Sequence, residues 1–136
     1  MKRGKPLPRG VAMVGAGVCQ FGAFREKSGR DLFVEAYKDM SQSVDKGFDP
    51  KDIEIVYIGN YSSDLFERQG HTAPIMADAV GLAPRPAVRV EDACASGGVA
   101  LRQGVMAIAS GMYDIVLVGG VEKMKKGSRR AREPSR

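Results

Sequence analysis

The fold is determined by residues 90–124, which read VEDACASGGVALRQGVMAIASGMYDIVLVGGVEKM. Apolar and small side chains recur at helical spacing over residues 95–110, and Gly111 follows where a helix is expected to end. Residues 115–118 are apolar at every position, which is typical of a strand that is covered on both faces of a sheet. The stretch therefore predicts a helix followed by a buried strand, and we expect this strand to be central.

The same alternation of strands and helices extends toward the N-terminus. The apolar pattern predicts helices over residues 31–46 and 72–80, and strands over residues 11–21, 53–58 and 87–90. We expect Ser28 or Asp31 to cap the first helix and Thr72 to cap the second. This repetition predicts an α/β fold, a mostly parallel sheet with helices on its faces.

Composition excludes several classes of protein. A chain of 136 residues, 43% hydrophobic and 27% charged, suits one globular domain. It has no apolar run near the roughly 18 residues of a membrane span and no apolar core of a signal peptide at its start. Cys19 and Cys94 are too far apart in sequence to indicate a disulfide framework or a metal site. We therefore expect a cytoplasmic protein that has no metal and does not contact a membrane.

The net charge of +5 is unevenly distributed along the chain. The segments 1–10 and 122–136 are both strongly basic, and the body between them is mildly acidic. No aromatic residues are interleaved with the basic ones, as they are in many nucleic-acid-binding proteins. We therefore expect one domain over residues 11–124, disordered basic ends over residues 1–10 and 125–136, and no nucleic-acid partner.

Cys94 is the strongest candidate for a reactive residue because it stands between a predicted strand and a predicted helix. Free backbone N–H groups and the positive end of the helix dipole favour thiolate at such a position. The same N–H groups can bind a developing oxyanion, and Gly97 and Gly98 leave room for a substrate. The alternative is a buried, inert cysteine in a tight turn.

Residues 90–124 resemble the thiolase family around its acyl-accepting cysteine. The shared order is a strand, a cysteine followed by Ser and Gly, a helix with paired small residues, a Ser-Gly turn, and a strand ending in Val-Gly-Gly-Val-Glu-Lys-Met. The similarity extends over residues 11–124 and is greatest to the acetyl-CoA acetyltransferase type. It implies a thiolase-like N-terminal half-domain.

The resemblance also implies a reaction. In the family, the cysteine that matches Cys94 attacks an acyl-CoA thioester and carries the acyl group, while its backbone N–H contributes to the oxyanion hole. A second acyl-CoA then loses an α-proton and forms the new carbon–carbon bond. Acyl-CoA is the substrate, and no separate cofactor is implied.

Other parts of the family pattern do not occur in this sequence. The family takes a Gly-His-Pro histidine, an oxyanion segment bearing Asn or His, and a second cysteine from a second half, and it grips coenzyme A with a loop domain. We therefore expect a truncated thiolase that is inactive alone, assembled as a homo-oligomer through residues 86–90 or with a chain that supplies the missing half. A non-catalytic interaction module is the alternative, and a ketoacyl-synthase relative is disfavoured by the Val-Gly-Gly-Val-Glu-Lys-Met motif.

The remaining candidate residues favour structural roles. His71, the only histidine, lies outside any Gly-His-Pro motif, and we expect it to serve structure or an interface. Arg89, Glu91 and Asp92 flank the Cys94 turn and are expected to be solvated or structural, while Cys19 is expected to be a small core residue.

A glycine-rich segment in the first predicted strand resembles a dinucleotide-binding loop only in part. Gln20 occupies the place of the third glycine in Gly15-Ala16-Gly17-Val18-Cys19-Gln20, and residues 57–60 supply no acidic residue at the end of the second strand. The sequence therefore does not indicate a dinucleotide cofactor.

Overall fold

A computed structural model describes residues 5–124 of the chain. Three parallel strands form one sheet in the order β2-β1-β3, and helices lie between them in sequence. The elements are α1 (Gly29–Gln42), the 3-10 turn η1 (Pro50–Asp52), β1 (Ile55–Gly59), α2 (Ser63–Phe66), α3 (Thr72–Ala79), β2 (Ala87–Val90), the 3-10 turn η2 (Ala93–Ala95), α4 (Ser96–Ala109) and β3 (Val116–Gly120). The predicted α/β class with a parallel sheet is confirmed, whereas residues 1–4 and 125–136 of the expected basic ends lie outside the described residues.

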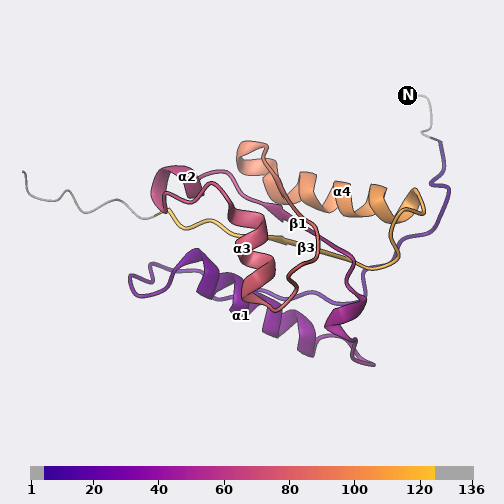
Figure 1. Ribbon diagram of the computed structural model, residues 1–136, viewed down its shortest axis with the longest axis horizontal. Helices are drawn as coiled ribbons and strands as arrows, with labels where there is room; N and C mark the ends of the chain where they lie inside the picture. Colours follow the sequence, from indigo (N-terminus) through magenta and orange to yellow (C-terminus); the bar gives the residue numbers. More distant parts are fainter. Residues whose placement is uncertain (1–4, 125–136) are drawn as a thin grey trace, which may run out of the picture.

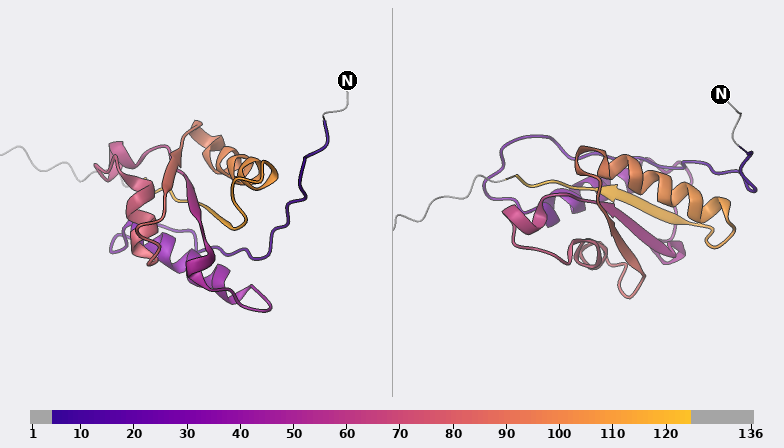
Figure 2. Two further views of the ribbon diagram at one scale, coloured as in Figure 1. Left: turned by 45° about the vertical axis from the view of Figure 1, so that its right-hand side comes forward. Right: turned by 90° about the horizontal axis from the view of Figure 1, so that it is seen from above.

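Helices cover both faces of this sheet. Helices α1 and α3 lie on one face and α4 lies on the other, as Figure 1 and the two turned views of Figure 2 show. Successive side chains of a strand point to opposite faces, so each strand contributes to both layers. The three-layer arrangement therefore explains why β1 and β3 carry apolar residues at adjacent positions.

The main core lies between the sheet and helices α1 and α3. Val56 and Ile58 of β1 are fully buried, and they pack in one cluster with Phe33 of α1 and with Ala73 and Met76 of α3. Burying side chains of this size contributes about 1.5–3 kcal/mol each relative to leaving them in water. This cluster fixes the positions of the two helices against the central strand.

Helix α4 approaches the opposite face so closely that two positions have no space for a side chain. A Cβ built on Gly104 would lie 2.6 Å from Cγ2 of Val118 in β3. A Cβ built on Gly59, the last residue of β1, would lie 2.7 Å from the backbone N of Gly97 and the carbonyl carbon and oxygen of Ser96. The small residues of α4 therefore allow its backbone to rest directly on the sheet.

The expectation of a central fourth strand is wrong. Strand β1 is central, and among the described residues β3 pairs only with β1. The all-apolar pattern of β3 has another cause, because Val116 and Val118 face α4 while Leu117 packs against the core on the other face. A strand can thus be covered on both faces and still have one free edge.

Residues 11–21 do not form the predicted strand. The segment runs beside α1, where the N–H of Ala16 donates to the hydroxyl of Ser43 (2.9 Å) and the N–H of Val18 donates to the carboxylate of Asp39 (2.9 Å). Gly17 lies against the backbone of α1, with no space for a Cβ beside Met40. The N–H groups of this segment therefore bond to side chains in or beside α1 instead of to a neighbouring strand. An apolar pattern alone does not reveal such contacts.

The structure confirms the predicted cap of α1 and contradicts the predicted cap of α3. Ser28 caps α1 in a capping box: its hydroxyl accepts from the N–H of Asp31, and the Asp31 carboxylate accepts from the N–H of Ser28 at 2.8 Å. Thr72 does not cap α3, because His71 occupies that position and the Thr72 hydroxyl donates to the carbonyl of Gln69. Helix α1 also ends at Gln42, four residues earlier than expected.

We expect two glycine-to-alanine substitutions to have different effects on stability. Gly59→Ala should lower the free energy of unfolding by about 2 kcal/mol, because the new methyl group collides with the backbone of α4. Gly98→Ala should leave it unchanged or raise it by up to about 1 kcal/mol, because nothing lies within 4 Å of its Cβ position inside a helix. Urea unfolding of both variants measures the difference, and equal effects would contradict the close approach of β1 and α4.

The capping box of α1 predicts a dependence of stability on pH. Hydrogen bonds from Ser28 to the Asp31 carboxylate hold the pKa of that carboxyl below its usual range. The ionised Asp31 carboxylate therefore stabilises the folded state fully above the unfolded-state pKa of about 4. This stabilisation is lost as the pH falls through the lowered pKa of the folded state. Asp31→Asn should be less stable than the parent at about pH 7, and the difference should narrow toward about pH 3.

The matched control for this measurement is Asp45→Asn, which changes an exposed aspartate beyond the end of the same helix. Denaturant midpoints of the parent and both variants across the pH range give the comparison. A difference between Asp31→Asn and the parent that stays constant with pH would show that the ionised carboxylate does not stabilise the helix start.

Candidate functional site

The segments that follow the three strands meet at one edge of the sheet. Because β1, β2 and β3 are parallel, their carboxyl ends point the same way, and residues 60–64, 91–95 and 121–124 come next in the chain. In open α/β sheets, ligands bind beyond this edge. Cys94 belongs to one of these segments.

Cys94 is the middle residue of the η2 turn (Ala93–Ala95), which joins β2 to α4. The residue is exposed, so it is not the buried cysteine of the alternative interpretation, and its reactivity stays a prediction. Among residues 5–124, no side chain caps the start of α4, and no atom lies within 4 Å of the Cβ positions of Gly97 and Gly98. An exposed thiol thus lies beside an uncapped helix start with open space above it, an arrangement suited to nucleophilic attack on a carbonyl group.

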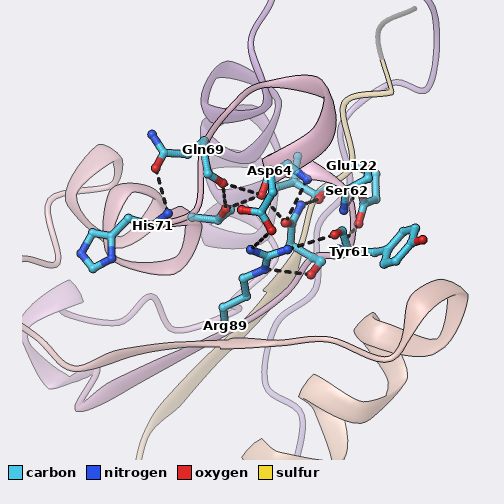
Figure 3. Close-up of polar contacts among 11 residues, drawn as sticks. Tyr61, Ser62, Asp64, Gln69, His71, Arg89 and Glu122 are labelled. Carbon is cyan, nitrogen blue, oxygen red and sulfur yellow. Dashed lines mark hydrogen bonds and ion pairs between the residues drawn. The ribbon is translucent and has the colours of Figure 1, made fainter.

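Arg89 connects the strand that leads to Cys94 with the segment that follows β1. Its guanidinium donates to the carbonyls of Asn60 (3.0 Å) and Tyr61 (2.9 Å) and pairs with the carboxylate of Asp64 at 2.7 Å. Figure 3 shows these contacts converging on the one side chain. With 20% of its side chain exposed, Arg89 is a structural link, as expected from its place at a strand end.

Glu122 holds the same segment from the opposite side. Its carboxylate accepts from the N–H groups of Tyr61 and Ser62 and from the hydroxyl of Ser62, as Figure 3 shows. The side chain of Asn60 also donates to the carbonyl of Val121 at 2.7 Å. Residues 60–62 are therefore clamped between β2 and the segment that follows β3.

A buried polar cluster lies beneath this clamp. Asn60, Ser63 and Thr72 are each at most 3% exposed. The Ser63 hydroxyl bonds to the side chain of Asn60 at 2.5 Å and lies 2.6 Å from the Thr72 hydroxyl. Since each of these side chains has a hydrogen-bond partner, the cluster joins β1 to α3 and leaves no group free for a ligand.

His71 stands apart from Cys94 and is exposed. Its backbone N–H donates to the side chain of Gln69 at 2.8 Å, and Figure 3 shows the imidazole ring directed away from the Arg89 and Glu122 contacts. Within residues 5–124, none of the hydrogen bonds uses this ring. His71 is the N-cap residue of α3 without a side-chain cap, so the expected structural or interface role of its side chain stays a prediction.

Glu91 and Asp92 both belong to the turn itself. The Glu91 carboxylate accepts from the N–H of Ala93 at 2.7 Å, and both residues are exposed. Cys19 is half-buried beside α1 and lies outside any strand, so it is not the strand residue that was expected. No cluster of metal-ligating side chains occurs within residues 5–124, and no helix in that range is long and apolar enough to cross a membrane.

A pocket of about 630 Å³ lies at the amino-terminal edge of the sheet. Its lining comes from the segments that precede the strands and includes Glu54, Arg85, Pro86, Tyr113 and Asp114. The pocket is therefore at the opposite end of the strands from Cys94 and does not belong to the same site.

Sequence reasoning found Cys94 and Arg89 but missed the roles of Asn60, Ser62 and Glu122. The available signal was position, because Asn60 follows β1 directly and Glu122 comes two residues after β3. Polar residues immediately after parallel strands meet at one edge, and this placement alone predicts that they contact one another.

Comparison with known proteins agrees with this geometry. Residues 11–136 match the family model described as thiolase, N-terminal domain. The chain is 51% identical over 116 residues to an acetyl-CoA acetyltransferase of Methanocaldococcus jannaschii and 47% identical over 116 residues to one of Methanothermobacter thermautotrophicus, in each case over 85% of this chain. It is also 32% identical over 99 residues, 72% of this chain, to a beta-ketoacyl-[acyl-carrier-protein] synthase III of Helicobacter pylori.

The chain spans 29%, 30% and 29% of the lengths of these three relatives. The family match covers all seven helices and strands that the structure describes. Both the sequence match and the parallel sheet with its strand–turn–helix around Cys94 therefore lead to one conclusion. The chain belongs to the thiolase family, whose N-terminal domain it matches.

Proposed function

We propose that this chain performs the acyl-accepting step of a thiolase-type acyl transfer, with Cys94 as the nucleophile and acetyl-CoA as the acyl donor. The observation that carries the proposal is the exposed thiol beside the uncapped start of α4, at the carboxyl edge of a sheet in a thiolase-family chain. The printed names of two relatives, both acetyl-CoA acetyltransferases, support the choice of donor. Both cysteines are free, which supports the cytoplasm as the compartment of this chemistry.

The proposed step exchanges one thioester for another. The Cys94 sulfur attacks the carbonyl carbon of acetyl-CoA, and N–H groups in the first turn of α4, beyond that of Ser96, which bonds to the carbonyl of Ala93, stabilise the charge that develops on the carbonyl oxygen. The bond from that carbon to the coenzyme A sulfur then breaks. Coenzyme A leaves as a thiol with the proton that Cys94 has lost, and an acetyl-thioester remains on Cys94.

The base that takes this proton comes, in our proposal, from outside the described residues. Within residues 5–124, Cys94 has no side-chain hydrogen-bond partner, and the only histidine, His71, is directed elsewhere. A general base must lie within about 3 Å of the proton that it takes, directly or through one water. We propose that a second copy of the chain supplies it, so that the assembled chain can accept the acetyl group without another protein.

We also propose that two copies associate through the free edge of β2, over residues 86–90. Strand β2 pairs only with β1 among the described residues, and Val88 on this strand is 42% exposed. A free strand edge with an apolar side chain is a ready surface for pairing. This association would place two Cys94 turns near one interface, since each turn begins three residues after the end of β2.

The acyl-transfer proposal predicts a covalent adduct. Incubation with acetyl-CoA should add one acetyl group to the chain, as measured by intact mass, and Cys94→Ala should abolish the adduct because the accepting sulfur is lost. Cys19→Ala is the matched control and should keep the adduct. A folded parent protein that gains no acetyl group, or an adduct that survives in Cys94→Ala, would overturn the proposal.

The association proposal predicts a change of molar mass in solution. Val88→Lys should convert a dimer to a monomer, because each lysine would bring a charge to the apolar edge of β2. Met112→Lys is the control, since Met112 is 72% exposed beyond the far end of α4. Light scattering after size-exclusion chromatography gives the masses, and a monomeric parent would refute this contact.

The acetylation and molar-mass measurements together also distinguish the proposed acyl transfer from the alternative function, a non-catalytic interaction module. A protein that dimerises through β2 but takes no acetyl group would be a non-catalytic interaction module. The exposed edge residue Val88 is the observation that favours this second candidate.

A further inference from the structure

The residue that precedes the candidate nucleophile has an unfavourable backbone conformation. Ala93 has φ of +44°, and within residues 5–124 Arg68 is the only other residue besides glycine with positive φ. The left-handed region is unfavourable for alanine because its Cβ crowds the following carbonyl oxygen. Such a conformation persists only where the surroundings hold it.

The side chain that holds it belongs to Ser96, the first residue of α4. Its hydroxyl accepts from the N–H of Asp92 at 2.8 Å and donates to the carbonyl of Ala93 at 2.8 Å. One bond is to the backbone N–H of Asp92, the residue before Ala93, and the other is to the carbonyl group of Ala93 itself. One hydroxyl therefore fixes the backbone on both sides of the strained φ angle.

Ser96 is in turn held by the sheet. It is 4% exposed, and its carbonyl group packs against Gly59 at the end of β1, where no Cβ could fit. The other side-chain contact to the turn comes from the exposed carboxylate of Glu91, which accepts from the N–H of Ala93. Of the two contacts, only that of Ser96 is anchored in the interior of the domain.

We infer that Ser96 is a positioning residue for Cys94, an inference that rests on the proposed function. Its hydroxyl has both of its hydrogen bonds inside the turn. By holding Ala93 in the left-handed region, it keeps the thiol of Cys94 exposed beside the start of α4. When the hydroxyl is removed, Ala93 relaxes toward negative φ and the turn that carries Cys94 changes shape.

The test uses three variants of the full 136-residue chain. Ser96→Ala should slow acetylation of Cys94 by acetyl-CoA about tenfold, because the two side-chain hydrogen bonds that anchor the turn in the interior are lost, while its backbone bonds and the Glu91 contact remain. Ala93→Gly alone should change the rate little, since glycine adopts positive φ without strain. The double variant Ser96→Ala with Ala93→Gly should recover most of the parental rate, because glycine at position 93 no longer needs to be held.

Ser110→Ala is the matched control. The Ser110 hydroxyl makes the same kind of bond, to the carbonyl of Ala107 at 2.8 Å, at the other end of α4. This variant should acetylate at the parental rate. A Ser96→Ala variant that also keeps the parental rate, or a double variant no faster than Ser96→Ala, would overturn the inference, because recovery by glycine is not expected of a residue that only fills the core.

A second readout separates this inference from the proposed function. Alkylation of Cys94 by iodoacetamide needs no acyl-CoA, and Cys94→Ala corrects for the contribution of Cys19. If the parent is not acetylated, the proposed function fails, but slower alkylation in Ser96→Ala and recovery in the double variant would still support the positioning role. Unchanged or faster alkylation in Ser96→Ala would overturn the role even in a protein that acetylates. Urea midpoints of each variant show that the compared proteins are folded.

Discussion

The close contact between the end of β1 and the first turn of α4 is the constraint on which the rest of the structure depends. Gly59 has no side chain, so the backbone of Ser96 and Gly97 can rest on the last residue of the central strand. This contact sets where α4 begins, and the position of α4 sets where the η2 turn must lie. Cys94 lies at the carboxyl edge because the helix that follows it rests directly on the end of the central strand.

Beside this contact, at the carboxyl edge of the sheet, charged side chains rather than apolar ones hold the neighbouring segment. Arg89 and Glu122 reach residues 60–62 from opposite sides, one with donors to carbonyl groups and the other with acceptors for N–H and hydroxyl groups. The segment next to the Cys94 turn is thereby held without side chains from a further layer. These contacts hold the segment in one position, as the acyl transfer proposed for Cys94 requires of the groups around it.

The sequence was informative where local pattern and tertiary environment agreed. The strands at residues 55–59, 87–90 and 116–120 and the helix with Cys94 near its start were all predictable, because their apolar residues meet the packing that their pattern requires. The prediction of a strand over residues 11–21 was wrong because an apolar pattern does not show whether a neighbouring strand is available for pairing. The prediction that β3 is central was wrong because a half-buried edge strand and a central strand have similar apolar patterns. The Ser96 hydroxyl and the Glu122 clamp depend on contacts between distant segments, which spacing does not encode.

The pairing of β1 with β3 has a consequence for how the chain reaches this structure. The two strands are far apart in sequence, and Glu122 comes 60 residues after Ser62, which it binds. Pairing between such distant segments requires closure of a long loop, an entropic cost that slows folding. During synthesis, β1 cannot pair with β3 until the last described elements have left the ribosome. The sheet and the clamp beside Cys94 are therefore completed together, by the same few residues.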